Sequence, residues 1–139
     1  MRFASLGSGS RGNALIVDAG ETKLLVDCGF STRVATARLA RLAAAPEDLT
    51  AILVTHEHSD HVGGVFALAR RHQLTVYLTH GTYVAAARGK SALPACRVID
   101  GHASFAIGSL EVLPFPVPHD AREPVQYAFN NGQHCLGVL

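Results

Sequence analysis

The sequence predicts a single α/β domain. Short apolar runs typical of buried strands alternate with amphipathic segments typical of helices. Hydrophobic residues make up 48% of the 139 positions, which is enough to build one core. Because no internal repeat, linker or low-complexity tract divides the chain, residues 1–139 are expected to form one unit.

Charge and composition exclude several classes of protein. Charged residues are 17% of the chain and the formal net charge is +1. This balance lacks the acidic excess of a disordered chain and the basic excess of a general nucleic-acid binder. The opening MRFASLGSGSRGN has no apolar core of a signal peptide, and no apolar run is long enough for a membrane span. We therefore expect a cytoplasmic protein without a membrane partner.

The three cysteines are widely spaced and form no C-x-x-C pair. Cys28, Cys96 and Cys135 are odd in number, so neither a disulfide framework nor a thiolate zinc site is indicated. Reduced thiols are expected. Cys28 and Cys135 lie within apolar runs, which predicts that both are buried.

The first part of the chain is predicted to start with a three-stranded meander. Its strands are apolar or alternating runs separated by the turns GSGSRGN and GET, and they cover residues 2–6, 14–19 and 23–29. Residues 31–45 change to a helical period, with Ser31 or Thr32 as N-cap and Pro46 as the stop. The continuous apolar run 51–55 is typical of a strand buried on both faces.

The second part continues the alternation of helices and strands. Apolar residues at Val62, Val65, Phe66 and Ala69 follow helical spacing, so a helix is expected from Val62 to about His72. A strand over 75–79 and a short Ala-rich helix over 81–88 follow. The remaining apolar runs predict five more strands, near residues 96–99, 103–107, 109–114, 125–129 and 135–139.

The stretch THEHSDHVGG lies between the buried strand 51–55 and the next helix. His56 and His58 are two positions apart, so both rings can point the same way from extended backbone. Asp60 and His61 fall in the first turn of the helix and face a neighbouring point. All four side chains are of types that bind zinc or a related divalent ion. Two adjacent metal sites therefore become possible.

Simpler roles compete with metal binding at single positions. Ser59 is expected to cap the helix, and Glu57 points away from its neighbours, either into solvent or behind the ligands. A lone histidine at a strand end usually needs no cation. Several imidazoles held close together would repel one another when protonated, so the group as a whole favours a bound metal.

The motif THEHSDHVGG resembles the H-x-H-x-D-H signature of the metallo-β-lactamase superfamily. LLVDCG and VPHDAREPVQY resemble two further motifs of that family. The opening GSGSRGNALIV, together with PHDA and EPV, is most similar to the bacterial YycJ or WalJ branch, whose members are DNA exonucleases or predicted phosphodiesterases. The resemblance implies an αββα sandwich with metal at the edge where its two sheets meet.

The resemblance also implies roles for particular residues. Two divalent ions, zinc or manganese, would be bound, the first by His56, His58 and His119 and the second by Asp60 and His61. Asp27 would orient the ligand loop through hydrogen bonds, and Asp120 would cap a turn or touch the site. The other four histidines match no ligand position and are assigned to the surface or to packing: His72, His80, His102 and His134.

Hydrolysis by a metal-bound hydroxide, oriented by Asp60 as catalytic residue, is the chemistry that the resemblance implies. Attack at phosphorus would make a phosphodiesterase or DNA exonuclease, and attack at an acyl carbon a thioester or lactone hydrolase. Backbone amides around Ser8 and the guanidinium of Arg11 suit an anion such as phosphate. The alternative is an ordinary turn, which Gly/Ser-rich loops form more often.

One departure from the family concerns its second half. The aspartate that bridges both metals and a last histidine have no counterpart before Leu139. The expectation is therefore a domain truncated at its C-terminus, with the first half of the sandwich and the start of the second. Such a chain would hold one ion or none, and would self-associate through uncovered apolar surface. A non-catalytic metal-binding role stays open.

Overall fold

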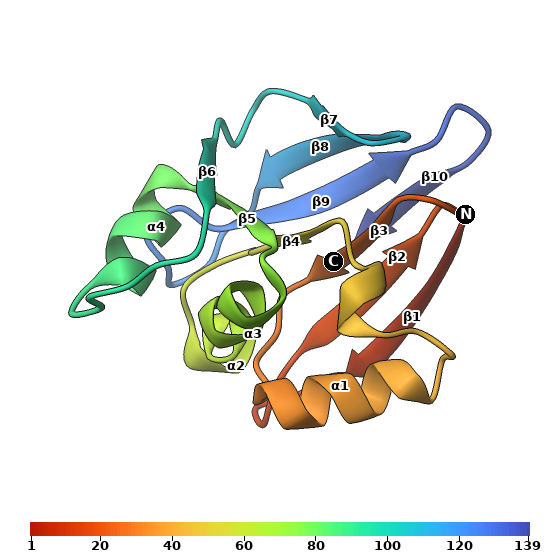
Figure 1. Ribbon diagram of the computed structural model, residues 1–139. Helices are drawn as coiled ribbons and strands as arrows, with labels where there is room; N and C mark the ends of the chain where they lie inside the picture. Colours follow the sequence, from red (N-terminus) through yellow and green to blue (C-terminus); the bar gives the residue numbers. More distant parts are fainter.

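Two β-sheets pack face to face, and helices cover the outer face of one of them (Figure 1). The computed structural model describes residues 1–139. The predicted α/β class is confirmed, and the layers correspond to one helical layer and two sheets of the expected sandwich. The C-terminal β10 lies in the second sheet, at its edge.

Sheet A has six strands in the order β1-β2-β3-β4-β5-β6. The first three strands form the predicted antiparallel meander, and β3 to β6 run parallel. Parallel strands bring their C-terminal ends to one edge, where loops can gather side chains. The strands are β1 Arg2–Gly7, β2 Ala14–Asp18, β3 Lys23–Val26, β4 Ala51–Leu53, β5 Thr75–Thr79 and β6 Cys96–Ile99.

Sheet B is antiparallel throughout, in the order β10-β9-β8-β7. Its inward residues alternate with outward ones along β9, where Val125, Tyr127 and Phe129 are buried. The hydroxyl of Tyr127 donates to the carbonyl of Val54 at 2.8 Å and so ties sheet B to the end of β4. The strands are β7 Phe105–Ile107, β8 Leu110–Pro116, β9 Val125–Asn130 and β10 Cys135–Val138.

The helices are short and pack against sheet A. They are α1 Thr32–Ala40, the 3₁₀ turn η1 Pro46–Asp48, α2 Ser59–Val62, α3 Val65–His72 and α4 His80–Ala87. The predicted cap Ser31 accepts a hydrogen bond from the amide of Val34. The longest helix has nine residues, and none combines the length and apolar character that a bilayer crossing requires.

Two cores explain the continuous apolar run of β4. Ile52 faces the helices and packs in the first core, with Leu25 and Val76 of the neighbouring strands. Ala51 and Leu53 point the other way, into the second core between the sheets. Every residue of β4 is therefore buried, as predicted for a strand covered on both faces.

The predicted helix 31–45 is wrong at its C-terminal end. The helix stops at Ala40, and Ala43 adopts a left-handed conformation with φ of 53°. The amide of Ala44 then donates back to the carbonyl of Leu39 at 3.1 Å, which closes a Schellman-type turn. Pro46 begins the 3₁₀ turn instead of ending the helix.

The predicted helix over 62–72 is divided in two at Gly63 and Gly64. The amide of Gly64 donates to the carbonyl of Cys28 at 2.8 Å, so it is turned toward the end of β3. A Cβ at Gly64 would collide with the carbonyl oxygen of Phe30. The close approach of these two backbone segments explains why helical spacing alone did not reveal the break.

Burial of the cysteines differs from the prediction at one position. Cys28 is buried as expected, and burial raises the pKa of its thiol to about 11. Cys135 is exposed, which corrects the prediction. β10 covers one side of the second core only, so Leu136 and Val138 turn inward while Cys135 turns to solvent.

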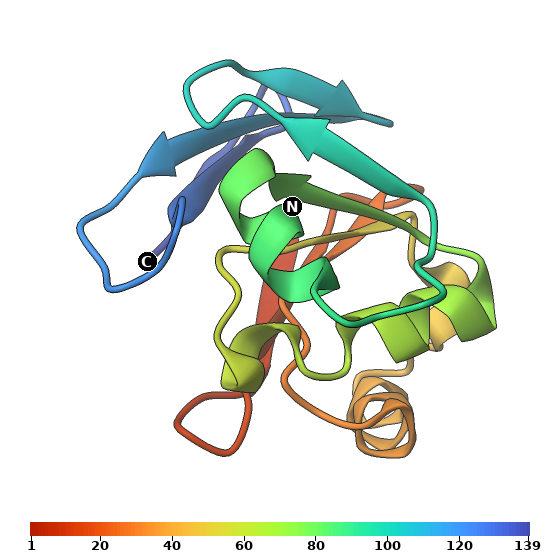
Figure 2. The same ribbon diagram turned by 90° about the vertical axis from the view of Figure 1, so that its left-hand side faces the viewer.

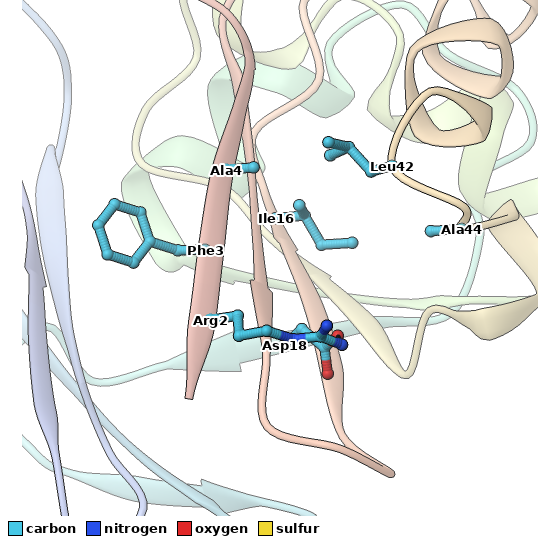
Figure 3. A pocket seen from close by; sticks show the side chains of 7 residues that line it. All are labelled: Arg2, Phe3, Ala4, Ile16, Asp18, Leu42 and Ala44. Atoms are coloured by element: carbon cyan, nitrogen blue, oxygen red, sulfur yellow. Dashed lines mark hydrogen bonds and ion pairs between the residues drawn. The ribbon is translucent and has the colours of Figure 1, made fainter.

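Strands β1 and β10 are the edges of the two sheets at one side of the sandwich. Beside β1, Ala4 and Leu42 help to line a groove of about 210 Å³ whose rim carries an ion pair of 2.6 Å between Arg2 and Asp18 (Figure 3). Phe3 projects from the opposite face of β1 and is 61% exposed. Unpaired edges beside apolar side chains favour association, and the expected self-association stays a prediction.

Sedimentation velocity of the purified chain should show a dimer or a larger assembly. Phe3→Glu is expected to shift the distribution toward monomer, because a charge on an edge strand opposes strand pairing. Leu113→Glu is the matched control, since Leu113 is 45% exposed on β8 inside sheet B. A wild-type chain that sediments only as a monomer would contradict the prediction.

Candidate metal centre

The sequence-predicted ligands gather where the loops after β4 and β8 meet. His56 and His58 follow β4, Asp60 and His61 lie on α2, and His119 lies between β8 and β9. Figure 2 shows both loops on the same side of the sandwich. One part of the group thus comes from sheet A and the other from sheet B.

Three imidazoles converge on one point. The Nε2 atoms of His56 and His119 are 3.2 Å apart, and one ring nitrogen of each of His56, His58 and His119 lies within 4.8 Å of the others. Nitrogens bound at 2.0–2.1 Å to a tetrahedral zinc ion would be separated by about 3.3 Å. The spacing and chemistry of this triad therefore fit a divalent metal ion.

Asp60 and His61 form a second group next to the triad. The Oδ2 atom of Asp60 is 3.6 Å from Nε2 of His61, and the rings of His61 and His56 have centroids 4.1 Å apart. The side-chain nitrogen Nδ2 of Asn13 lies 3.0 Å from Oδ2 of Asp60 and 3.1 Å from Nε2 of His61. The pair thus lies beside the triad, and its role at a second metal site stays a prediction.

Asn13 was not among the predicted site residues. It ends the Gly-rich loop between β1 and β2, and its side chain also donates to the carbonyl of Gly9 at 3.1 Å. The main-chain amide of Asn13 donates to the carbonyl of Asp60 at 2.7 Å. An asparagine closing a Gly/Ser-rich turn was the available signal, but its partners lie 47 residues away in sequence.

Asp27 is a buried carboxylate that contacts Thr55 and His61 beside the histidine triad. Its Oδ1 accepts from the amide of Thr55 at 2.8 Å. Its Oδ2 accepts from the hydroxyl of Thr55 at 2.7 Å and lies 2.8 Å from Nδ1 of His61. The residue is left-handed, with φ of 59°, which aspartate tolerates better than most residues. This geometry is what an orienting residue requires.

Thr55, which the sequence did not single out, sets the state of His56. Its hydroxyl hydrogen goes to Asp27, so its oxygen accepts from Nδ1–H of His56 at 2.9 Å. His61 likewise directs Nδ1–H at Asp27. We assign these tautomers from the hydrogen-bond network. In these tautomers Nε2 of each ring carries no hydrogen: Nε2 of His56 is turned toward His119, 3.2 Å away, whereas Nε2 of His61 accepts from the side-chain NH₂ of Asn13 at 3.1 Å.

Burial and neighbouring charges shift the pKa values of His56 and His61 in opposite directions. Burial lowers the pKa of His56 to about 4, and the nearby His61, His119 and His58 act in the same direction. Burial also acts to lower the pKa of His61, but the hydrogen bond and charge of Asp27 outweigh it and raise that pKa above 6.5. His56 is therefore neutral at neutral pH, with a lone pair available.

The remaining predicted residues lie around this centre. Asp120 is exposed, with Oδ1 3.4 Å from Nδ1 of His119 and its carbonyl 3.1 Å from Nε2 of His58. Ser8 lines a hollow together with Asp27 and His61, whereas Arg11 is exposed and does not line it. Glu57 is half-buried, and its Oε1 accepts from the amide of Arg122 at 2.8 Å.

The histidines that matched no ligand position lie away from the centre. His80, His102 and His134 are exposed. His72 is half-buried at the end of α3, with Nδ1 3.0 Å from Oε1 of Glu47. None of these four belongs to the histidine triad.

Comparison with known proteins matches both the sequence and the fold. The sequence profile of the metallo-beta-lactamase superfamily matches residues 7–133. The chain is 39% identical over 145 residues to exodeoxyribonuclease YycJ of Bacillus anthracis, and 37% identical over 142 residues to exodeoxyribonuclease WalJ of Streptococcus pneumoniae. These alignments cover 100% and 99% of this chain but 53% of each relative, so the chain spans about half the length of the curated relatives it matches.

Solved structures show the same architecture. A B3 metallo-β-lactamase with an active-site glutamic acid is similar with a TM-score of 0.78 at 22% identity. The match covers 98% of this chain and 57% of that one. At this level of identity the similarity shows the fold alone.

Replacing Asp27 by asparagine should weaken metal binding by about 10- to 100-fold, because partners that orient ligands typically contribute this much to affinity. Asparagine keeps the size of the side chain and tolerates the left-handed backbone, but its NH₂ group would face a donor. Zinc titration against a chromophoric chelator measures the effect. Asp18→Asn, which alters the ion pair on β2, is the control. Equal affinity in Asp27→Asn and wild type would refute the role of Asp27.

In the metal-free chain, NMR titration of the histidine rings should separate His56 from His61. His56 is expected to stay neutral until the pH approaches about 4, and His61 to have a pKa raised above that of an ordinary histidine by Asp27. Below pH 6.5 the unfolded chain takes up a proton at His56 that the folded chain refuses, so this residue lowers stability as the pH falls. His61 has the opposite effect, which is lost as the pH rises through its raised pKa. Similar pKa values for the two rings would contradict the network.

Proposed function

This chain belongs to the metallo-β-lactamase superfamily, and on that basis we propose that it is a metal-dependent hydrolase that cleaves phosphodiester bonds in DNA. Two relatives that match nearly the whole chain are named exodeoxyribonucleases. Because the chain spans about half of each of them, the activity of the whole protein is part of the proposal.

The observation that carries the proposal is the convergence of His56, His58 and His119. We propose that they hold one divalent ion, zinc or manganese, and that Asp60 and His61 contribute to a second. When bound, such ions supply an activated water and stabilise negative charge that develops on attacked and leaving oxygens. The low pKa of His56 and its bond to Thr55 keep that ring ready to bind.

Asp60 is proposed to orient the attacking water. Its carboxylate is half-buried on α2, and Asn13 holds its Oδ2 at 3.0 Å. Asn13 and Asp27 thus constrain the Asp60–His61 pair from two sides, which limits rotation of the side chains. A carboxylate held in this way can accept a proton from a nucleophile placed beside the triad.

A basic hollow next to α2 favours a phosphodiester substrate over an acyl one. Arg70 and Lys90 line this hollow of about 290 Å³, which begins at Gly63 directly after α2 and has no acidic side chain in its lining. Cationic side chains near a hydrolytic centre attract the backbone phosphates of nucleic acids. We propose that a DNA strand passes here, and that the protein acts in the cytoplasm.

The whole protein, supplied with Mn²⁺ or Zn²⁺, should degrade end-labelled duplex DNA. His58→Ala and Asp60→Asn are expected to reduce the rate by at least about 100-fold, since even residues that only support ligands contribute 10- to 100-fold. His102→Ala, an exposed histidine outside the triad, should retain activity. The readout is product length on denaturing gels over time.

Parallel assays with a thioester and a lactone test the alternative substrates. Turnover of either one, with DNA left intact, would replace the phosphodiester by an acyl bond and keep the same centre. Stoichiometric metal without turnover of any substrate would favour a metal-binding module. Unchanged DNA cleavage in both His58→Ala and Asp60→Asn would reject the proposed centre.

A further inference from the structure

The loop between β8 and β9 carries His119, the only triad member that comes from sheet B. Its side chain is 41% exposed and touches the triad through His56 at 3.2 Å. His56 and His58, in contrast, sit on the corner between β4 and α2, which hydrogen bonds to β3 and β5 hold. The closure of the triad therefore depends on what fixes residues 117–124.

Glu57 fixes this loop from the side of sheet A. It stands between His56 and His58, and its Oε1 accepts from the main-chain amide of Arg122 at 2.8 Å. Its Oε2 is buried and has no hydrogen-bond partner. A buried carboxylate oxygen without a hydrogen-bond partner lowers the stability of the fold. Glu57 is therefore expected at this position only if the hydrogen bond of its Oε1 to Arg122 has a role.

Glu123 fixes the same loop from the side of α4. Its Oε2 accepts from the amide of Gly81, in the first turn of that helix, at 2.6 Å. Its carbonyl accepts from the hydroxyl of Thr79 at 2.8 Å and from that of Thr82 at 3.4 Å. A Cβ at Gly81 would approach Cβ of Glu123 to 2.7 Å, so loop and helix are already in close contact. The loop passes beside α4 in Figure 1.

We propose that Glu57 and Glu123 are positioning residues that hold His119 against His56 and His58. Neither acts on the substrate. Each accepts from a main-chain amide, and so links loop 117–124 to sheet A on one side and to α4 on the other. Without these links the loop would occupy the closed arrangement for a smaller fraction of time, and apparent metal affinity would fall by that fraction. This inference rests on the metal centre proposed above.

Metal affinity of the stripped chain tests the inference without requiring activity. Glu57→Ala and Glu123→Ala should each weaken Zn²⁺ and Co²⁺ binding by about 10-fold or more. The visible absorption of bound Co²⁺ should also lose intensity, because a displaced third imidazole changes the coordination geometry. Glu57→Gln retains an acceptor oxygen, removes the charge from the buried Oε2, and should bind nearly as tightly as wild type. Glu21→Ala, at an exposed turn, is the matched control.

A double-mutant cycle with His119→Ala separates positioning from general stability. If Glu57 acts through His119, then Glu57→Ala has no further effect on Co²⁺ affinity once His119 is removed. An equal loss in both backgrounds would overturn the inference. Where Glu57→Ala fails to fold by circular dichroism, Glu57→Asp shortens the reach by one methylene and should weaken binding in the same His119-dependent way.

The remaining outcomes distinguish this inference from the metal centre itself. A wild-type chain that binds neither Co²⁺ nor Zn²⁺ would reject the metal centre and the positioning role together. A wild-type chain that binds metal, with Glu57→Ala and Glu123→Ala unchanged in affinity and spectrum, would reject the positioning role alone.

Discussion

The buried carboxylate of Asp27 is the interaction on which the centre depends. It accepts from the amide and hydroxyl of Thr55 and from the ring of His61, so each of its oxygens has a partner in a place where water is excluded. A charge buried in this way is costly unless it is fully paired. Moving Thr55 or His61 would leave that charge exposed to an apolar interior, and this cost keeps the ligand loop in one conformation.

Main-chain hydrogen bonds around Asp27 also hold the loops of the centre in place. Asp27 follows β3, and its left-handed conformation turns the chain. After this turn the main-chain amide of Cys28 donates to the carbonyl of His61, and the carbonyl of Cys28 accepts from the amide of Gly64. The amide of Gly29 donates to the carbonyl of Asn13 at 3.0 Å. The main chains of three segments distant in sequence are thus in direct contact. Such close contact requires glycine, because a Cβ at Gly29 would collide with the backbone of Asp60.

The two sheets contribute to the centre in different ways. Sheet A supplies His56 and His58 from a rigid corner at the end of a buried parallel strand. Sheet B supplies His119 from an exposed loop that depends on Glu57 and Glu123 for its position. Tyr127 ties the sheets together behind the histidines through its bond to Val54. The three histidines can converge in this way only when both sheets are packed, so the triad depends on the packing of the sandwich.

What the sequence determined by itself was local in range. Alternation and helical spacing predicted the order of the elements, and the crowding of THEHSDHVGG predicted that His56, His58, Asp60 and His61 would lie together, because a strand-to-helix corner is specified by adjacent residues. His119 and Asp27 were predicted as site residues from the resemblance of their motifs to those of the family.

The tertiary structure alone decided what depends on contacts between residues distant in sequence. Gly64 breaks a helix because it meets Cys28, and Cys135 is exposed because β10 covers one side of a core. Thr55, Asn13 and Glu57 gain their roles from partners 28 to 65 residues away, and no local pattern encodes such a partner.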